Sequence, residues 1–100
     1  MTIWFVSRHP GALEWAARHG VQFDRHASHL DVTEVITGDT VIGILPVHLA
    51  AEICVRGAEY WNLSLDLITV DRGRELSTDE LERSNARLER FDVRKHERSA

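Results

Sequence analysis

The sequence predicts a small α/β sandwich with a mostly parallel β-sheet. Two short apolar runs, at residues 3–6 and 40–45, are each followed within four residues by a proline that begins a helix. A third apolar run, at residues 60–67, follows the second helix. Strands that alternate with helices along a chain form a parallel sheet covered by those helices, so this order defines the fold class.

The first strand and helix are the clearest pair. A strand is expected over Thr2 to Val6, because four consecutive apolar residues suit a strand that is buried on both faces. The helix is expected over Pro10 to His19, with apolar residues at helical spacing and Gly20 at its end. Trp15 lies off this apolar stripe, so we expect it to face a partner or to cover the edge of the sheet.

The middle of the chain predicts a weak strand, a strong strand and a strong helix. Asp24 to Leu30 forms the weak strand, and residues 32–37 form a helical turn or a loop before the turn at Gly38. Thr40 to Leu45 forms the strong strand. The helix begins at Pro46 and closes at Gly57, and its apolar face follows the spacing i, i+3, i+4, i+7, i+8 through Val47, Ala50, Ala51, Cys54 and Val55.

The C-terminal third predicts one strand and one helix. The strand covers Tyr60 to Leu67 and alternates apolar with polar residues, and a charged loop follows at 70–76. Ser77 and Glu80 form a capping box, so we expect a helix from there to about Phe91. Four arginines fall on one stripe of that helix, as a solvated face or as a subunit contact or ligand rim: Arg83, Arg87, Arg90 and Arg94.

Length and composition limit the class of protein. One hundred residues make one α/β domain, residues 1–100, with a polar tail at 95–100 that we expect to fray. The net charge of −4 argues against binding to long nucleic acid but allows a small anionic ligand. Cys54 is the only cysteine, which excludes an internal disulfide and fits a reducing cytoplasm. We expect a cytoplasmic protein, since the chain has neither a signal-peptide pattern nor an apolar run near the roughly 20 residues of a membrane span.

Polar residues interrupt the first buried strand where parallel sheets bind ligands. Ser7, Arg8 and His9 follow that strand, and ligands bind beyond the carboxyl ends of parallel strands. Gly11 lies in the next helical turn, whose free amides favour an anion. Arginine binds two phosphate oxygens at once and histidine transfers protons near neutral pH, so the cluster suits phosphoryl chemistry. The alternative is that Arg8 pairs with an acidic residue and that His9 only caps the helix.

The other strands should bring further residues to the same edge. Pro46 and His48 begin the second helix, Asp66 ends the third strong strand, and His29 joins them if the weak strand is parallel. The alternatives are an exposed His48 and an Asp66 that only starts a turn. His26 and His29 have the spacing of metal ligands on a helix, but this segment is expected to be extended and no carboxylate or cysteine completes a set, so we expect no metal.

Several segments together resemble one known family. They are Trp4 to Ala12, His29 to Asp31, Gly38 to Gly43, Leu45 to Cys54 and Leu63 to Asp66. They resemble a small CRISPR-associated accessory family found with type III systems. The resemblance implies a Rossmann-like three-layer sandwich related to the CRISPR-associated Rossmann fold, a homodimer, and ring-nuclease activity. Ring nucleases cleave cyclic oligoadenylates, chiefly cyclic tetra-adenylate, and so switch off an antiviral signal.

The resemblance also implies a mechanism without metal or cofactor. In this class the 2′-hydroxyl of the substrate attacks the adjacent phosphate and gives a 2′,3′-cyclic phosphate. Arg8 and the helix amides would then stabilise charge on the phosphoryl oxygens, and Ser7 would orient one of them. His9 or His48 would act as the acid or base. A two-fold dimer would present two copies of this site to opposite phosphates of the ring.

Three other functions stay open on the sequence alone. A sensor or sponge would bind the cyclic nucleotide without cutting it, and adenine would stack on Trp15 or Tyr60 in either case. A phosphomonoesterase is suggested because Arg-His after a first strand resembles histidine phosphatases, but Pro10 replaces the expected glycine and the chain is short for that family. A structural subunit of a larger CRISPR complex would need no nucleotide affinity.

Overall fold

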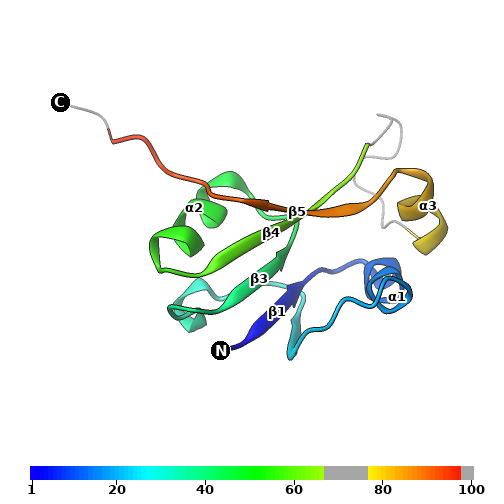
Figure 1. Ribbon diagram of the computed structural model, residues 1–100, viewed down its shortest axis with the longest axis horizontal. Coiled ribbons are helices and arrows are strands. Elements are labelled where there is room, and N and C mark those ends of the chain that lie inside the picture. Colours follow the sequence, from blue (N-terminus) through cyan, green and yellow to red (C-terminus); the bar gives the residue numbers. More distant parts are fainter. Residues whose placement is uncertain (67–76, 98–100) are drawn as a thin grey trace.

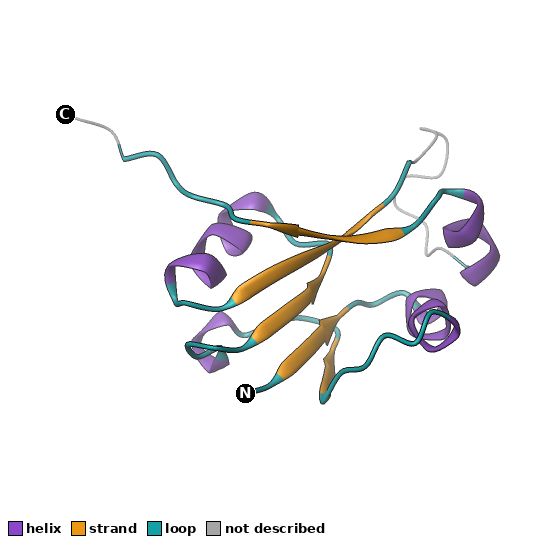
Figure 2. Cartoon of the chain, viewed as in Figure 1, coloured by secondary structure: helices purple, strands orange, loops and turns teal. Residues whose placement is uncertain are grey.

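The computed structural model describes residues 1–66 and 77–97 as a sheet with helices on both faces (Figures 1 and 2). None of the helices in these ranges is long and apolar enough to cross a membrane. In chain order the elements are β1 (Ile3–Val6), α1 (Pro10–Arg18), β2 (Arg25–Ala27), the 3-10 helix η1 (Val32–Glu34), β3 (Thr40–Gly43), α2 (Val47–Val55), β4 (Glu59–Ser64), α3 (Thr78–Arg83) and β5 (Arg87–Phe91). The charged loop predicted at 70–76 lies outside the described residues.

The sheet confirms the predicted fold class. Its five strands have the order β2-β1-β3-β4-β5, and all neighbours are parallel except β4 and β5. The chain leaves β1 toward β2 on one side and leaves β3 toward β4 on the other, so the strand order reverses between β1 and β3. In open parallel sheets, ligands bind beyond the carboxyl ends of the strands at such a reversal. The topology therefore predicts a ligand site at the carboxyl ends of β1 and β3.

Two hydrophobic clusters hold the three layers together. One face of the sheet packs against α2 and η1 through Trp4, Val6, Val41, Ile53 and Tyr60, among others. The other face packs against α1 and α3 through Phe5, Trp15, Ile42, Leu63 and Leu81. Side chains alternate between the two faces along each strand, which explains why β1 is apolar at every position and why Val41 and Ile42 of β3 are both buried. The helices sit on opposite faces in Figure 1, α2 on one side and α1 with α3 on the other.

The long C-terminal helix was a wrong prediction. The capping box forms as expected, because the Ser77 hydroxyl accepts the Glu80 N–H and the Glu80 side chain accepts the Ser77 N–H, but α3 ends at Arg83. Asn85 then takes a left-handed backbone, with φ of 55°, which turns the chain. Residues 87–91 pair antiparallel with β4 and cover an edge whose backbone groups would otherwise stay unpaired.

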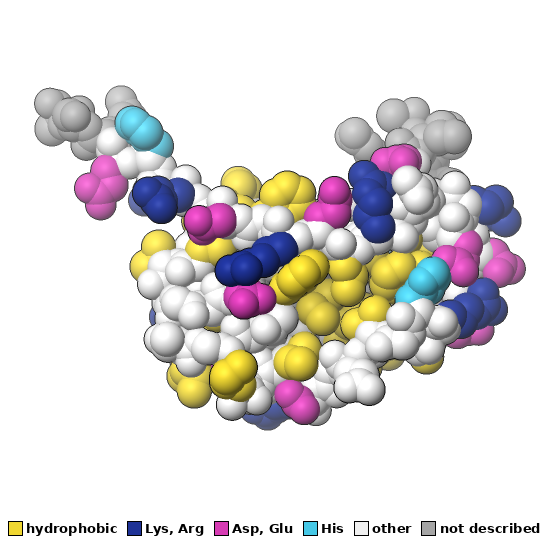
Figure 3. Space-filling model, in the orientation of Figure 1, with side chains coloured by type: hydrophobic (Ala, Val, Ile, Leu, Met, Phe, Trp, Pro, Cys, Tyr) yellow, Lys and Arg dark blue, Asp and Glu magenta, His cyan; other side chains and the backbone are white. Residues whose placement is uncertain are grey.

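This strand also removes the predicted arginine stripe. Arg83 lies in α3, Arg87 and Arg90 lie in β5, and Arg94 follows it, so the four do not share a helical face. Acidic and basic side chains lie next to one another over β5 in Figure 3, as salt bridges from Arg87 to Glu89 (3.5 Å) and from Arg90 to Glu59 (3.8 Å) require. Exposed pairs of this kind contribute little stability, so the main role of β5 is to pair with β4.

Trp15 also departs from its predicted position. Its side chain is 3% exposed and packs between α1, α3 and the sheet. Its ring stacks on His19 with 4.4 Å between ring centroids, and the His19 imidazole lies 2.8 Å from the Glu82 carboxylate of α3. The prediction failed because α3, which is distant in sequence, provides the apolar surface that covers this ring. Trp15 therefore neither faces a partner nor lies at the edge of the sheet.

Candidate functional site

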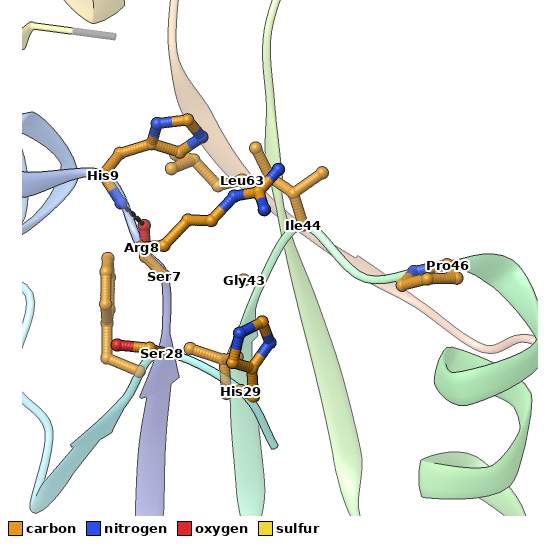
Figure 4. A pocket seen from close by; sticks show the side chains of 11 residues that line it. Ser7, Arg8, His9, Ser28, His29, Gly43, Ile44, Pro46 and Leu63 are labelled. Carbon is orange, nitrogen blue, oxygen red and sulfur yellow. Dashed lines mark hydrogen bonds between the residues drawn. The ribbon is translucent and has the colours of Figure 1, made fainter. Parts of the chain in front are cut away.

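A cavity of about 420 Å³ lies at the reversal of strand order, beyond the ends of β1, β2 and β3 (Figure 4). The residues that follow these strands make up most of its wall, and the ends of β1 and β3 with Leu63 of β4 make up the rest. The lining residues are Phe5, Val6, Ser7, Arg8, His9, Ser28, His29, Gly43, Ile44, Pro46 and Leu63. Five residues predicted from the sequence, namely Ser7, Arg8, His9, His29 and Pro46, thus line one cavity.

Backbone hydrogen bonds fix the turn that carries Ser7, Arg8 and His9. The Ser7 N–H donates to the Ala27 carbonyl at 3.0 Å, which continues the pairing of β1 with β2 by one residue. The Ser7 hydroxyl oxygen accepts the His9 N–H at 3.0 Å. The His26 imidazole lies 2.8 Å from the Ser7 carbonyl oxygen. The turn is therefore held on both sides, and the Ser7 hydroxyl keeps its own hydrogen for another acceptor.

The cavity is cationic. Arg8 is exposed, and none of the ion pairs between described residues includes it. Figure 4 shows its side chain extending from the end of β1 toward Ile44, while His9 and His29 lie on either side. No lining residue in the part of the chain that the structure describes is acidic. A guanidinium group that meets no carboxylate, beside two imidazoles, favours a ligand with negative charge.

Gly43 sets how closely the strand ends approach each other. A Cβ atom at this position would lie 2.6 Å from the Val6 carbonyl oxygen and 3.3 Å from the Val6 Cβ. Only glycine therefore allows β3 to pass β1 at this distance, directly at the floor of the cavity. The sequence analysis missed Gly43, Ser28 and Ile44. A glycine at the end of a buried strand was the available signal for the first of them.

Three residues predicted for the site lie elsewhere. Gly11 is buried in α1, and its carbonyl oxygen lies 3.1 Å from the Thr78 hydroxyl. His48 lines a separate cavity of about 590 Å³ between α2 and the segment after β5. Asp66 is bound by Asn85 at 3.2 Å and by Arg87 at 3.1 Å, and these two hydrogen bonds lower the pKa of the Asp66 carboxyl.

The aromatic residues proposed for adenine stacking are both buried. Trp15 and Tyr60 are each 3% exposed, so neither ring offers a face to a base. The Tyr60 hydroxyl accepts the Leu45 N–H at 3.0 Å and lies 2.5 Å from the Asn62 side-chain oxygen. Burial raises the pKa of Tyr60, and the hydrogen bond from Leu45 only partly opposes that effect. The Tyr60 hydroxyl thus fixes the Leu45 N–H and the Asn62 side chain near the ends of β3 and β4.

Metal ligands are not clustered in the part of the chain that the structure describes. No group of three or more His, Cys, Asp or Glu side chains there is placed to hold a metal ion. His26, which was considered with His29 as a metal pair, turns its imidazole to the Ser7 carbonyl oxygen instead. Among the described residues, the groups that could contact a ligand in the first cavity are therefore hydroxyl, guanidinium and imidazole groups.

Fold and cavity together define a class of protein. A mostly parallel sheet that has helices on both faces and a cavity at its reversal of strand order is the arrangement of a small Rossmann-like α/β fold. Residues 4–94 match the family described as "Putative CRISPR-associated protein (Cas_VVA1548)", and the chain belongs to this CRISPR-associated family. Neither the curated proteins nor the solved structures contain a significant match to the chain.

Proposed function

We propose that this protein is a ring nuclease. It opens cyclic oligoadenylate, chiefly cyclic tetra-adenylate, to linear products and so ends an antiviral signal of type III CRISPR systems in the cytoplasm. The observation that carries the proposal is the first cavity, which Arg8, His9 and His29 line at the reversal of strand order and which has no acidic residue among its described lining residues. Membership of a CRISPR-associated family supports a substrate that belongs to CRISPR signalling.

The proposed reaction is attack of a 2′-hydroxyl of the ring on its neighbouring phosphate. A base takes the proton of that hydroxyl while the bond from its oxygen to phosphorus forms. The bond from phosphorus to the 5′-oxygen breaks, and that oxygen receives a proton from an acid. The products end in a 2′,3′-cyclic phosphate and a 5′-hydroxyl, and the chemistry requires no redox step and no metal-bound nucleophile.

Four of the lining residues have a role in this reaction. Arg8 stabilises the charge that develops on the phosphoryl oxygens, since its guanidinium group meets no carboxylate of the described chain. Ser7 donates its hydroxyl hydrogen to one phosphate oxygen, because its oxygen is already used by the His9 N–H. His9 and His29 transfer the two protons. His48, which was the other histidine considered from the sequence, lies in a different cavity.

A homodimer completes the proposal. Four adenylates in a ring give a ligand with four phosphates and four-fold symmetry, which a two-fold dimer matches at opposite positions. Two cationic cavities then face two phosphates, and the ring is cut at two places. Each copy contributes one full set of Ser7, Arg8, His9 and His29, so the number of cuts reports the number of active subunits.

The test combines the natural ring with a ring that lacks the nucleophile. Purified protein is incubated with cyclic tetra-adenylate and excess chelator. The products are separated by chromatography and identified by mass spectrometry. We expect linear products with 2′,3′-cyclic phosphate ends, and no cleavage of a ring methylated at every 2′-oxygen. An intact natural ring, a requirement for added metal, or cleavage of the methylated ring would each contradict the mechanism. Tight binding of the natural ring without cleavage would identify a sensor instead.

A further inference from the structure

A further cavity, distinct from the one that His48 lines, adjoins the first cavity at the same edge of the sheet, and we call it the second cavity. It has a volume of about 370 Å³ and lies beside the end of β4 and the start of β5. Its lining residues are Ile44, Asn62, Leu63, Ser64, Leu65, Arg87 and Glu89. Two of them, Ile44 and Leu63, also line the first cavity, so the two hollows share a wall. A ligand larger than one of these cavities would therefore extend into both.

The two cavities differ in charge although each contains an arginine. Arg87 forms ion pairs with Asp66 at 3.1 Å and with Glu89 at 3.5 Å, and it also donates to the Asn85 carbonyl oxygen at 3.0 Å. Two carboxylates thus compensate its charge, whereas none of the described residues that line the first cavity beside Arg8 is acidic. A phosphate gains little from a guanidinium group that already holds two carboxylates. The second cavity suits a polar, uncharged group.

The Asn62 amide is held in one orientation at this cavity. The Tyr60 hydroxyl lies 2.5 Å from the Asn62 Oδ1, and the Asn62 Nδ2 donates to the Ser64 Oγ at 2.9 Å. Tyr60 is itself fixed, because it is buried and accepts the Leu45 N–H. Since an amide offers two N–H groups and two oxygen lone pairs, one donor and one acceptor of Asn62 stay available for a ligand.

Ile44 provides apolar surface where the two cavities meet. Its side chain is 51% exposed although it directly follows a buried strand. An adenine nucleotide has the matching parts: an anionic phosphate, an apolar ring face, and an uncharged edge with an amino donor next to a ring nitrogen acceptor. An asparagine amide pairs with that edge through two hydrogen bonds.

We propose that the second cavity binds an adenine base of the ligand whose phosphate lies in the first cavity. The free donor and acceptor of Asn62 pair with the 6-amino group and the adjoining ring nitrogen, and Ile44 contacts the face of the base. Asn62 is then a specificity residue that distinguishes adenine from other bases. This inference rests on the proposed function, because it takes cyclic oligoadenylate as the ligand.

The experiment compares two rings on the full-length protein. Cyclic tetra-inosinate has an oxygen in place of each 6-amino group and a hydrogen on the neighbouring N1, so the donor becomes an acceptor and N1 becomes a donor. Wild type should have a KM, or a Kd if it does not cleave, roughly 10- to 100-fold higher for the inosinate ring. The Asn62→Leu variant should bind both rings within about threefold of each other, and Asn85→Gly serves as the control because Asn85 lies outside the cavity and has a positive φ that suits glycine.

Each result separates this inference from the proposed function. Wild type that cleaves or binds both rings equally overturns the inference and leaves ring-nuclease activity standing. An Asn62→Leu variant that folds, as shown by its thermal midpoint, and keeps the preference of wild type also overturns it. Wild type that neither binds nor cleaves cyclic tetra-adenylate overturns both proposals. If Asn62→Leu does not fold, the comparison of the two rings on wild type alone still decides the question.

Discussion

The charged groups at the two ends of the sheet differ in how many partners they have among the described residues. At the amino end, Asp39 is 1% exposed, and its carboxylate accepts hydrogen bonds from the Thr2 N–H at 2.9 Å, the Ile36 N–H at 3.1 Å and the Trp4 Nε1 at 3.4 Å. At the carboxyl end, Arg8 is exposed and forms no ion pair with any described residue. Among the described residues, the Asp39 carboxylate therefore has hydrogen-bond donors around it, whereas the Arg8 guanidinium has no ion-pair partner.

This difference separates a group that stabilises the fold from the group that we propose binds the ligand. Burial alone raises the pKa of the Asp39 carboxyl, but the three N–H donors together outweigh that effect, so its pKa lies below the ordinary value for aspartate. The carboxylate ties the starts of β1 and β3 together, since Thr2 precedes one strand and Asp39 the other. Arg8 at the other end forms no such link among the described residues, and under the proposed function a phosphate of the ligand is its partner.

The largest effect is expected at Arg8. We expect Arg8→Ala to lower the rate of ring cleavage by about 10²- to 10³-fold, since a donor that stabilises transition-state charge contributes on this scale. Arg8→Lys should recover part of the rate, because lysine keeps the charge but not the two-pronged geometry. Single-turnover cleavage measures the rate, and the thermal midpoint should stay that of wild type.

Arg25 is the matched arginine control. It lies on β2, and its guanidinium carbon is 4.6 Å from the centroid of the Trp4 ring, away from the first cavity. Arg25→Ala should keep the full cleavage rate and lose about 0.5–1 kcal/mol of stability. If Arg8→Ala cleaves at the normal rate, or if both variants lose activity alike, the assignment of the site to the end of β1 is wrong.

The next largest effect is expected at Asp39, at the amino end of the sheet, and it concerns stability instead of the cleavage rate. Asp39→Asn should lower the free energy of unfolding by about 2–3 kcal/mol, because an amide group would turn a donor toward N–H groups that need an acceptor. Urea unfolding measures the loss. The cleavage rate per folded molecule should stay unchanged, and a loss of rate without a loss of stability would contradict the division between the two ends.

A substitution at Gly43 should affect both properties. Gly43→Ala places a methyl group 2.6 Å from the Val6 carbonyl oxygen, so β1 and β3 must move apart at the floor of the cavity. We expect a loss of about 1–3 kcal/mol, typical of overpacking, together with slower cleavage. Gly20→Asn is the control, since no atom lies within 4 Å of the position and asparagine tolerates its φ of 68°. A fully active and stable Gly43→Ala protein would show that the spacing of the strand ends is not critical.

The smallest effect is the pH dependence of the amino end. The pKa of Asp39 is lower in the folded than in the unfolded chain, so its stabilisation is complete above the unfolded pKa of roughly 4 and is lost as the pH falls through the folded pKa. The stability difference between wild type and Asp39→Asn should therefore shrink on acidification. Urea unfolding over a series of pH values measures it. A difference that stays constant into the acid range would contradict this role of the carboxylate.

Local patterns predicted the candidate site only in part. Ser7, Arg8 and His9 were found because they interrupt an apolar run before a proline, and His29 was found because a parallel β2 brings it to the same edge. His48 and Asp66 were assigned to that edge as well. His48 of α2 instead lines a separate cavity, and Asp66 accepts a hydrogen bond from Arg87 of β5. Asn62 was not predicted from the sequence, since the role that we propose for it depends on hydrogen bonds to Tyr60 and Ser64 that a strand alone does not predict.

The sequence by itself determined the parallel core of this protein: β1, α1, β3, α2 and β4, and the polar turn after β1. These elements follow from apolar periodicity and from proline and glycine positions, which act within a few residues. Only the tertiary structure decided that residues 87–91 form an edge strand and that α3 covers Trp15. It also decided that Asp39 is buried and accepts hydrogen bonds from N–H groups as far as 37 residues away in the sequence. These outcomes depend on unpaired backbone and exposed apolar surface that exist only after the core has formed.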